Sequence, residues 1–204
     1  MAITSRRKRR LVRPPAYRDA NLIIIATEGE LTEKVYFEHL WGRERGVQVR
    51  ILPTEEGRSA PRHVLSRLTK YKSENEIGKG DELWLMIDKD RWDDKQLVEV
   101  ASQTRARRFS LAVSTPCFEL WLYLHLGDPA DEMREKPCPF FASLIRGILG
   151  SFDPANLNMA HFESNLDAAI RRARSLDEHP DERWPNSLGT RVYRVVESIL
   201  GSKR

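Results

Sequence analysis

The chain has 204 residues, of which 40% are hydrophobic and 31% charged, a composition typical of a folded globular protein and not of a disordered one. This length suits one α/β domain. No apolar run approaches the ~20 residues that a membrane span needs, and no apolar core of a secretory signal follows the basic N-terminus. We therefore expect a cytoplasmic protein that does not contact a membrane.

The formal net charge of +4 comes from the N-terminal segment. Residues 1–20 hold seven arginine and lysine residues against one aspartate, a charge of +6, which leaves −2 for the rest of the chain. A basic block of this kind is a candidate arm for nucleic-acid phosphates, and a solvated, disordered leader explains it equally well. The candidate nucleic-acid-binding residues of this arm are Arg6, Arg7, Lys8, Arg9 and Arg10.

Strand and helix patterns alternate over the first 126 residues. Apolar or alternating segments predict strands over 21–26, 47–52, 83–87 and 109–113. Helical spacing predicts one helix from Thr32 to near Gly42 and another that begins at Pro61 and has an apolar stripe reaching Tyr71. A third helix is predicted from a segment that resembles a capping box, Asp93–Gln96, to about Arg107, and a fourth over 117–126. Such alternation favours a parallel sheet with right-handed crossovers.

The remainder of the chain has helical patterns only. A loop over 127–139 precedes predicted helices at 140–149, about 159–176 and about 190–200, with a polar loop at 177–185. We expect these helices to cover the sheet, so that residues 21–204 form one domain whose helical C-terminal part begins at about residue 136. Residues 1–20 would form a disordered arm.

Carboxylates follow two of the predicted strands where each strand ends. Glu28 comes after the first strand, and Asp88 and Asp90 come after the third. Because parallel strands end at the same edge of a sheet, these three acids can converge there. Clustered carboxylates repel one another and suit a hard divalent cation, Mg²⁺ or Mn²⁺. The alternative for each acid is an ordinary solvated loop or helix cap.

Other charged residues could extend such a site. Glu33, on the first turn of the next helix, is a fourth candidate ligand, or an acid that complements the helix dipole. Glu119 lies among apolar residues, so it must be paired or ligated, and a structural salt bridge with an arginine is the alternative. Lys89 and Arg91 are placed to bind a phosphate or to stabilise developing negative charge.

The cysteines and His125 are more readily explained as structural residues than as catalytic ones. The two cysteines, Cys117 and Cys138, form neither a disulfide framework nor a zinc pattern. Cys117 stands at a strand-to-helix turn, where a nucleophilic thiol is conceivable, but a small buried cysteine is favoured. His125 lies on a largely apolar helix, which favours a hydrogen-bonded core residue over a catalytic base.

Three blocks of sequence together resemble the RloB-like family, which is often found in bacterial defence loci. They are E-G-x-x-T-E at 28–33, the D-x-D of Asp88-Lys89-Asp90, and S-x-P-C-F-E-x-W-x-x-x-H at 114–125. A fourth block, usually N-P-S-T-like, is matched more loosely at 185–190. That family is similar in turn to TOPRIM proteins, in which a glutamate and a D-x-D hold Mg²⁺.

The resemblance implies a TOPRIM-like parallel four-stranded sheet with flanking helices and a C-terminal helical cover. It implies metal ligands at Glu28, Asp88 and Asp90. In the related nucleases a second acid lies four residues after the first glutamate, whereas Glu33 lies five residues after Glu28, so the resemblance does not assign Glu33 a role. The implied function is an Mg²⁺-dependent nuclease that cleaves RNA, including tRNA, or DNA, as an effector of antiphage defence with an ATPase encoded alongside as a candidate partner. Alternatives are a non-catalytic nucleotide- or partner-binding subunit and a nucleotidyltransferase that uses the same metal site. The oligomeric state stays open, with a homo-oligomer among the options.

Overall fold

The computed structural model of the protein describes residues 20–29, 31–41, 46–54, 60–90 and 92–201. The basic arm and Arg91, both assigned above to nucleic-acid binding, lie outside these residues. In the described residues, no helix is both long and apolar enough to cross a membrane.

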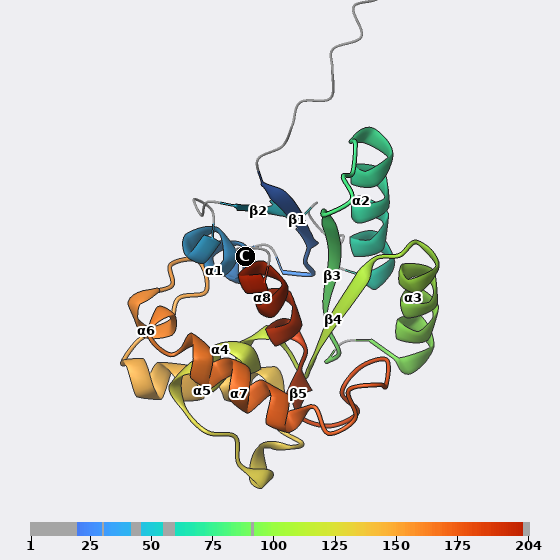
Figure 1. The fold of residues 1–204 in the computed structure, drawn as a ribbon. Coiled ribbons are helices and arrows are strands. Elements are labelled where there is room, and N and C mark those ends of the chain that lie inside the picture. The colour runs from blue at the N-terminus through green and yellow to red at the C-terminus, as the bar shows by residue number, and fades with distance from the viewer. Residues whose placement is uncertain (1–19, 30, 42–45, 55–59, 91, 202–204) are drawn as a thin grey trace, which may run out of the picture.

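A mostly parallel sheet forms the centre of the molecule (Figure 1). Its strands are β1 (Asn21–Ala26), β2 (Val47–Leu52), β3 (Glu82–Asp88), β4 (Ser110–Thr115) and β5 (Gly189–Thr190), arranged in the order β2-β1-β3-β4-β5. The first four strands are parallel, as the sequence predicts, and β5 pairs antiparallel to β4. The expected four-stranded sheet is therefore wrong by one short antiparallel strand.

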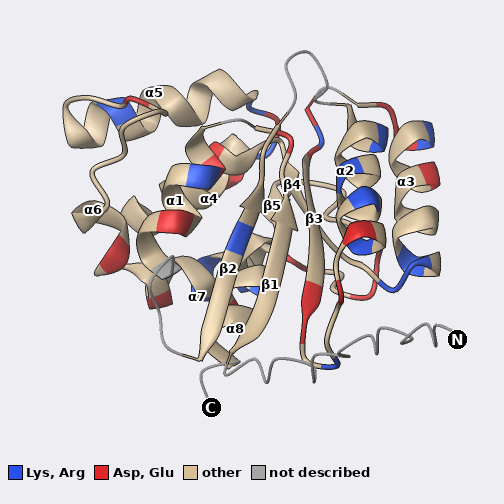
Figure 2. Ribbon diagram, turned by 90° about the horizontal axis from the view of Figure 1, so that it is seen from above, with Lys and Arg blue, Asp and Glu red and all other residues tan. Residues whose placement is uncertain are grey.

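Helices cover both faces of the sheet (Figure 2). The helical elements are α1 (Thr32–Trp41), α2 (Pro61–Glu74), α3 (Asp94–Ala106), α4 (Phe118–Leu126), η1 (Asp131–Met133), α5 (Cys138–Leu149), α6 (Ala160–Glu163), α7 (Leu166–Leu176) and α8 (Val192–Gly201). Helices α2 and α3 pack on one face, and the other helices gather on the opposite face. Along β1, Ile23 and Ile25 contribute to one core and Leu22 and Ile24 to the other, because successive side chains of a strand point to opposite faces.

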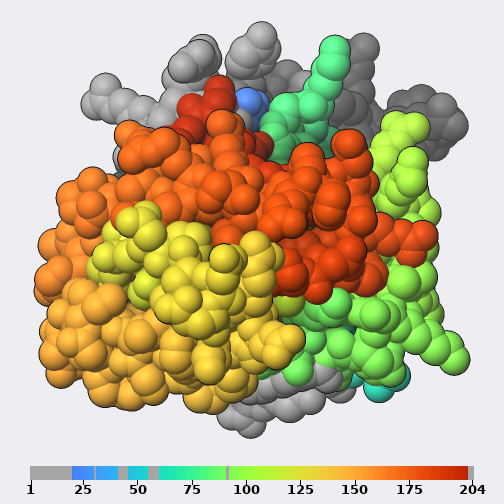
Figure 3. All heavy atoms as spheres, turned by 90° about the horizontal axis from the view of Figure 1, so that it is seen from below, coloured from blue at the N-terminus to red at the C-terminus, as the bar shows by residue number. Residues whose placement is uncertain are grey.

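The C-terminal helices form the expected cover. Seen from below, residues in the yellow to orange range of the colour scale make up most of the visible surface (Figure 3). Helix α4 lies beneath them and is buried along nearly its whole length. The single helix expected over 159–176 is divided into α6 and α7, and α8 begins at Val192 because Gly189 and Thr190 pair with the end of β4.

A buried ion pair holds the loop that precedes β5. The side chains of Asp177 and Arg191 are each 2% exposed, and their carboxylate and guanidinium approach to 3.0 Å. The Tyr193 hydroxyl and the Arg194 guanidinium also donate to Asp177, at 2.8 and 2.9 Å. Burial opposes the charge of Asp177, but these donors and the neighbouring arginines together hold its pKa below the ordinary value. This network ties the end of α7 to the start of α8, and the Arg191 backbone N–H donates to the Val113 carbonyl of β4 at 3.0 Å.

The same segment brings two of the sequence blocks together. The Ser114 and Thr190 hydroxyls are hydrogen-bonded at 2.8 Å, and the Thr115 hydroxyl donates to the Pro185 carbonyl at 2.9 Å. The end of β4 is therefore fixed by residues from about seventy positions further along the chain.

Candidate metal centre

The acids that follow β1 and β3 meet at the C-terminal edge of the sheet. β1 and β3 are neighbouring parallel strands, with Ala26 opposite Leu85. The Glu28 carboxylate accepts hydrogen bonds from the Trp92 indole at 2.9 Å and from the backbone N–H of Asp88 at 3.4 Å. Glu28 is thus held against the end of β3, within side-chain reach of Asp88.

Glu33 turns back from the first turn of α1 toward the same place. Its carboxylate accepts a hydrogen bond from the backbone N–H of Gly29 at 3.0 Å, and the residue is buried. A Cβ atom on Gly29 would collide with this carboxylate, so a larger residue at this position would force the Glu33 side chain to move. The turn after β1 therefore places two acids, Glu28 and Glu33, at the same edge.

The pKa values of two of the carboxyl groups are raised, partly by the negative charges of the other carboxylates. Burial, opposed by hydrogen bonds and assisted by the charges of Glu119 and Glu28, raises the pKa of Glu33 from 4.5 to about 7. Burial, followed by the charges of Glu33, Glu28, Glu119 and Asp90, raises the pKa of Asp88 well above its usual range. Within the described residues, neither Glu33 nor Asp88 forms an ion pair with an arginine, lysine or histidine.

The segment after β3 is fixed against the end of β4. The backbone N–H groups of Lys89 and Asp90 donate to the carbonyls of Ser114 and Pro116, at 2.8 and 3.1 Å. Asp90 itself is exposed, at the rim of the cluster. The Lys89 ammonium lies 3.3 Å from the Asp94 carboxylate on the first turn of α3. In the structure Lys89 is thus paired with a surface acid beside the cluster.

Arg67 on α2 anchors the turn that carries Glu28. Its guanidinium donates to the Thr27 carbonyl, to the Pro53 carbonyl at 2.9 Å and to the Thr54 hydroxyl at 3.1 Å. The hydroxyls of Thr27 and Thr54 in turn donate to the Gly29 carbonyl, at 2.8 and 3.2 Å. This role of Arg67 could not be predicted, because the helical pattern of α2 reveals only its apolar stripe.

Cys117 and Cys138 form a disulfide, which corrects the expectation that the two cysteines form no disulfide framework. Cys117 is buried, as the sequence favours, and in this state it has no thiol that could act as a nucleophile. The bond joins the N-cap of α4 to the first residue of α5. The Cys138 sulfur lies 3.0 Å from the Glu119 carboxylate. Because a disulfide sulfur has no proton to donate, this is a packing contact. Sequence spacing could not show that two residues 21 positions apart meet in space.

His125 is a core residue, as the sequence favours. Its Nδ1 lies 2.9 Å from the Trp121 carbonyl, and its Nε2 lies 3.0 Å from the Tyr36 hydroxyl. Since a carbonyl can only accept, Nδ1 carries the proton and Nε2 accepts from the tyrosine. Burial lowers the pKa of His125 to about 4, so the ring is neutral near pH 7. Both ring nitrogens are engaged within the core.

Comparison of the chain with models of known protein families tests the resemblance to the RloB-like family. Residues 23–199 match the family model of the RloB-like proteins, a span that includes all five of the acids described above. The chain belongs to the RloB-like family. No curated protein and no solved structure matches it. Family membership, inferred from the motifs, is thereby confirmed, and the acidic cluster is a feature of the matched region of this RloB-like chain.

Proposed function

We propose that this RloB-like protein is a nuclease of the TOPRIM type that depends on Mg²⁺ or Mn²⁺. The observation that supports the proposal is that Glu28 is hydrogen-bonded to the Asp88 backbone at one edge of a parallel sheet, and that the charges of Glu28, Glu33 and Glu119 raise the pKa of Asp88. Carboxylates in such a cluster repel one another and hold protons at unusually high pH. A bound divalent cation would relieve this repulsion, and oxygen ligands of this kind suit Mg²⁺ or Mn²⁺. Among the described residues, no three of these carboxylates have oxygens within 4.8 Å of one another, so their side chains would draw together on binding.

Each residue has a proposed role. Glu28, Asp88 and Asp90 would hold the cation, and Glu33 and Glu119 would complete or support the site. When bound, the cation would supply an activated water and a positive charge for the leaving oxygen of a phosphodiester. Because carboxylates bind metal in the deprotonated form, Glu33 and Asp88 would release protons on metal binding.

The Glu28 carboxylate is oriented before any metal binds. The Trp92 indole holds one carboxylate oxygen at 2.9 Å, and Arg67 and Thr54 fix the backbone on either side of the acid. Such preorganisation lowers the cost of assembling the site. Lys89 would leave Asp94 to contact the phosphate, since a surface ion pair contributes only about 0–1 kcal/mol.

The proposed substrate is RNA, including tRNA, or DNA, and the proposed setting is antiphage defence with an ATPase encoded alongside as partner. These proposals rest on the family to which the chain belongs. The carboxylate cluster supports the reaction class, hydrolysis of a phosphodiester, and is equally suited to either nucleic acid.

Cleavage of labelled RNA and DNA by the wild type and by Asp88→Asn tests the proposal. The wild type should cleave at least one of them with Mg²⁺ or Mn²⁺, and chelation should stop the reaction. Asp88→Asn should be slower by about a hundredfold or more, because a metal contributes several kcal/mol to the transition state. Glu135→Gln, an exposed acid outside the cluster, serves as the matched control and should behave as the wild type.

Metal binding provides a second readout. Calorimetry should detect Mn²⁺ binding to the wild type and to Glu135→Gln, and much weaker binding to Asp88→Asn. If Asp88→Asn cleaves nucleic acid as fast as the wild type, the acidic cluster is not the site of the reaction. If the wild type binds no metal and cleaves neither nucleic acid, the proposed nuclease function is wrong.

A further inference from the structure

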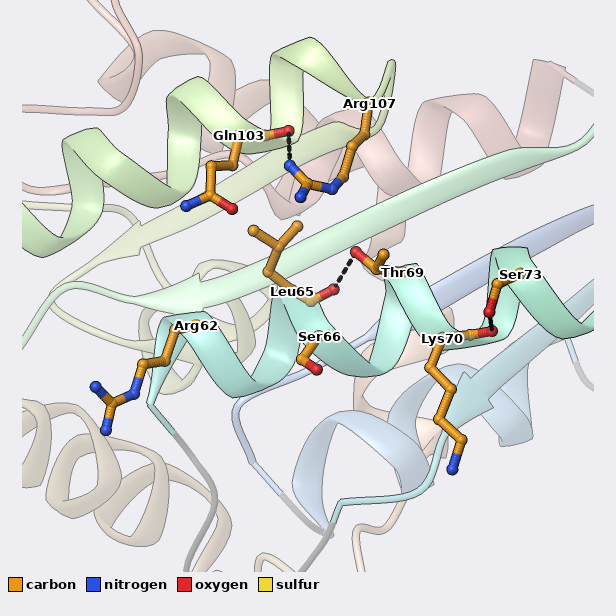
Figure 4. A pocket seen from close by; sticks show the side chains of 8 residues that line it. All are labelled: Arg62, Leu65, Ser66, Thr69, Lys70, Ser73, Gln103 and Arg107. Carbon is orange, nitrogen blue, oxygen red and sulfur yellow. Dashed lines mark hydrogen bonds between the residues drawn. The ribbon is translucent and has the colours of Figure 1, made fainter.

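A polar groove of about 430 Å³ lies between α2 and α3, on the face of the sheet opposite the C-terminal cover (Figure 4). Three cations line it together with uncharged polar side chains, namely Arg62, Lys70, Arg107, Ser66, Ser73 and Gln103. The Arg107 side chain turns back along α3 to the Gln103 carbonyl, and the Arg62 and Lys70 side chains extend from α2 on the side away from α3 (Figure 4). Cations from two helices thus line the same groove.

None of the described residues that line the groove is an acid. No acid occurs between Pro61 and Ser73 on α2, or between Gln103 and Arg108 at the end of α3. In the described part of the chain, Arg62 and Lys70 form no ion pair. Glu99 lines an adjoining cavity of about 190 Å³, together with Arg62 and Gln103.

The Arg107 side chain is also without an acid among the described residues. Its guanidinium donates to the Gln103 carbonyl of its own helix at 3.1 Å, and donors of the guanidinium stay unused. The Lys72 ammonium lies 3.1 Å from the Arg107 carbonyl and so adds a further positive charge at the same end of α3. The surface between the two helices therefore attracts anions.

The topology connects this groove to the acidic edge of the sheet. Both helices follow parallel strands, so each begins at the edge where the strands end, and Arg62 lies on the first turn of α2 at that edge. The 14 residues of α2 span about 21 Å at 1.5 Å per residue. The groove thus leads from the side of Glu28 and Asp88 toward the opposite edge of the sheet.

We propose that this groove between α2 and α3 binds the phosphodiester backbone of a nucleic acid whose reacting phosphate lies at the acidic edge. The inference rests on the proposed nuclease function for the identity of the ligand. An acidic cluster by itself repels a polyanion, so a basic surface beside it is needed to hold the chain. The cations are spread along the two helices, which suits successive phosphates of a chain better than one small anion.

Charge-neutral substitutions test the proposal in the full-length protein. The groove variant combines Arg62→Gln, Lys70→Gln and Arg107→Gln. The control variant combines Lys136→Gln, Arg146→Gln and Arg171→Gln, three exposed cations of the C-terminal cover with the same total charge. Binding of labelled single-stranded RNA and DNA is measured by fluorescence anisotropy, with EDTA present and with salt between about 50 and 200 mM.

The groove variant should bind roughly tenfold or more weakly at low salt, and the slope of log affinity against log salt should fall by about 2. The control variant should keep both values near those of the wild type. Equal losses in the two variants, or no loss in the groove variant, would overturn the proposal. If the triple variant does not fold, the test is repeated with Arg62→Gln alone, which changes an exposed residue. The slope of log affinity against log salt should then fall by about 0.7.

The two proposals fail in different ways. Metal-dependent cleavage together with unchanged binding by the groove variant contradicts the groove and leaves the nuclease intact. Groove-dependent binding by a wild type that cleaves no nucleic acid with Mg²⁺ or Mn²⁺ contradicts the nuclease and leaves the groove as a binding surface.

Discussion

Replacement of Glu33 by glutamine should change how the stability of the metal-free protein depends on pH. The pKa of Glu33 rises from 4.5 to about 7 on folding, chiefly through burial. At about 1.4 kcal/mol per pKa unit, this difference corresponds to about 3 kcal/mol. Below pH 4.5 the carboxyl is protonated in both states, and between 4.5 and about 7 the unfolded chain loses the proton first. The folded state therefore loses stability as the pH rises through this window.

Glu33→Gln removes the charge and keeps the oxygen that accepts from the Gly29 backbone. We expect its free energy of unfolding to exceed that of the wild type by up to about 3 kcal/mol near pH 8, and to approach it near pH 5. Urea denaturation followed by tryptophan fluorescence, with EDTA present, measures the difference at each pH. Glu135→Gln, which removes an exposed acid, is the control and should follow the wild type.

Addition of Mg²⁺ should make the wild type more stable than Glu33→Gln near neutral pH, the reverse of the order without metal. A ligand that binds only the folded state stabilises it, and the wild type offers the cation one carboxylate more than Glu33→Gln does. Wild-type and Glu33→Gln curves that run parallel across the whole pH range would refute the assignment of the raised pKa to Glu33.

Three further outcomes follow from contacts in the structure. Gly29→Ala places a methyl group against the Glu33 carboxylate and should weaken Mn²⁺ binding measured by calorimetry, whereas Gly147→Ala, with open space around it, should not. Asp177→Asn leaves the buried Arg191 without its partner and should cost about 3–5 kcal/mol in urea denaturation. Because the pKa of Asp177 is low in the folded state, the wild type should lose this stabilisation as the pH falls into the acid range. Reduction of the disulfide, which closes a loop of 21 residues, should lower stability by about 3 kcal/mol in the same assay, and an unchanged midpoint would contradict that value.

Local sequence patterns were sufficient for most of the elements. The strand at 21–26 and the strand at 47–52 have the predicted bounds, and Asp93 is confirmed as the N-cap of α3 by the hydrogen bond from the Gln96 N–H to its side chain at 2.8 Å. β5 was not predicted because two residues are too few to show a periodicity, and its existence depends on contacts with β4. The interruption between α6 and α7 was likewise absent from the apolar pattern.

For the candidate site, the sequence predicted that acids would follow β1 and β3 at one edge of the sheet, but not what holds them there, and their role in metal binding stays a prediction. Glu28 and Asp88 meet because they end adjacent parallel strands, a consequence of topology that strand patterns can anticipate. The support from Arg67 and Trp92 and the contact of Glu119 with a disulfide depend on side-chain packing across distant segments. Such contacts leave no local periodic signal in a single sequence.

The strand order has a consequence for where a substrate can approach. From β1 the chain passes outward to β2 through α1 on one face, whereas from β3 it passes the other way to β4 through α3 on the opposite face. The connections after β1 and β3 therefore diverge, and the sheet has its topological switch point between these two strands. Glu28 and Asp88 lie on the two sides of this switch point, at the ends of β1 and β3. The opposite directions of the two connections therefore determine from which side a ligand could approach these acids.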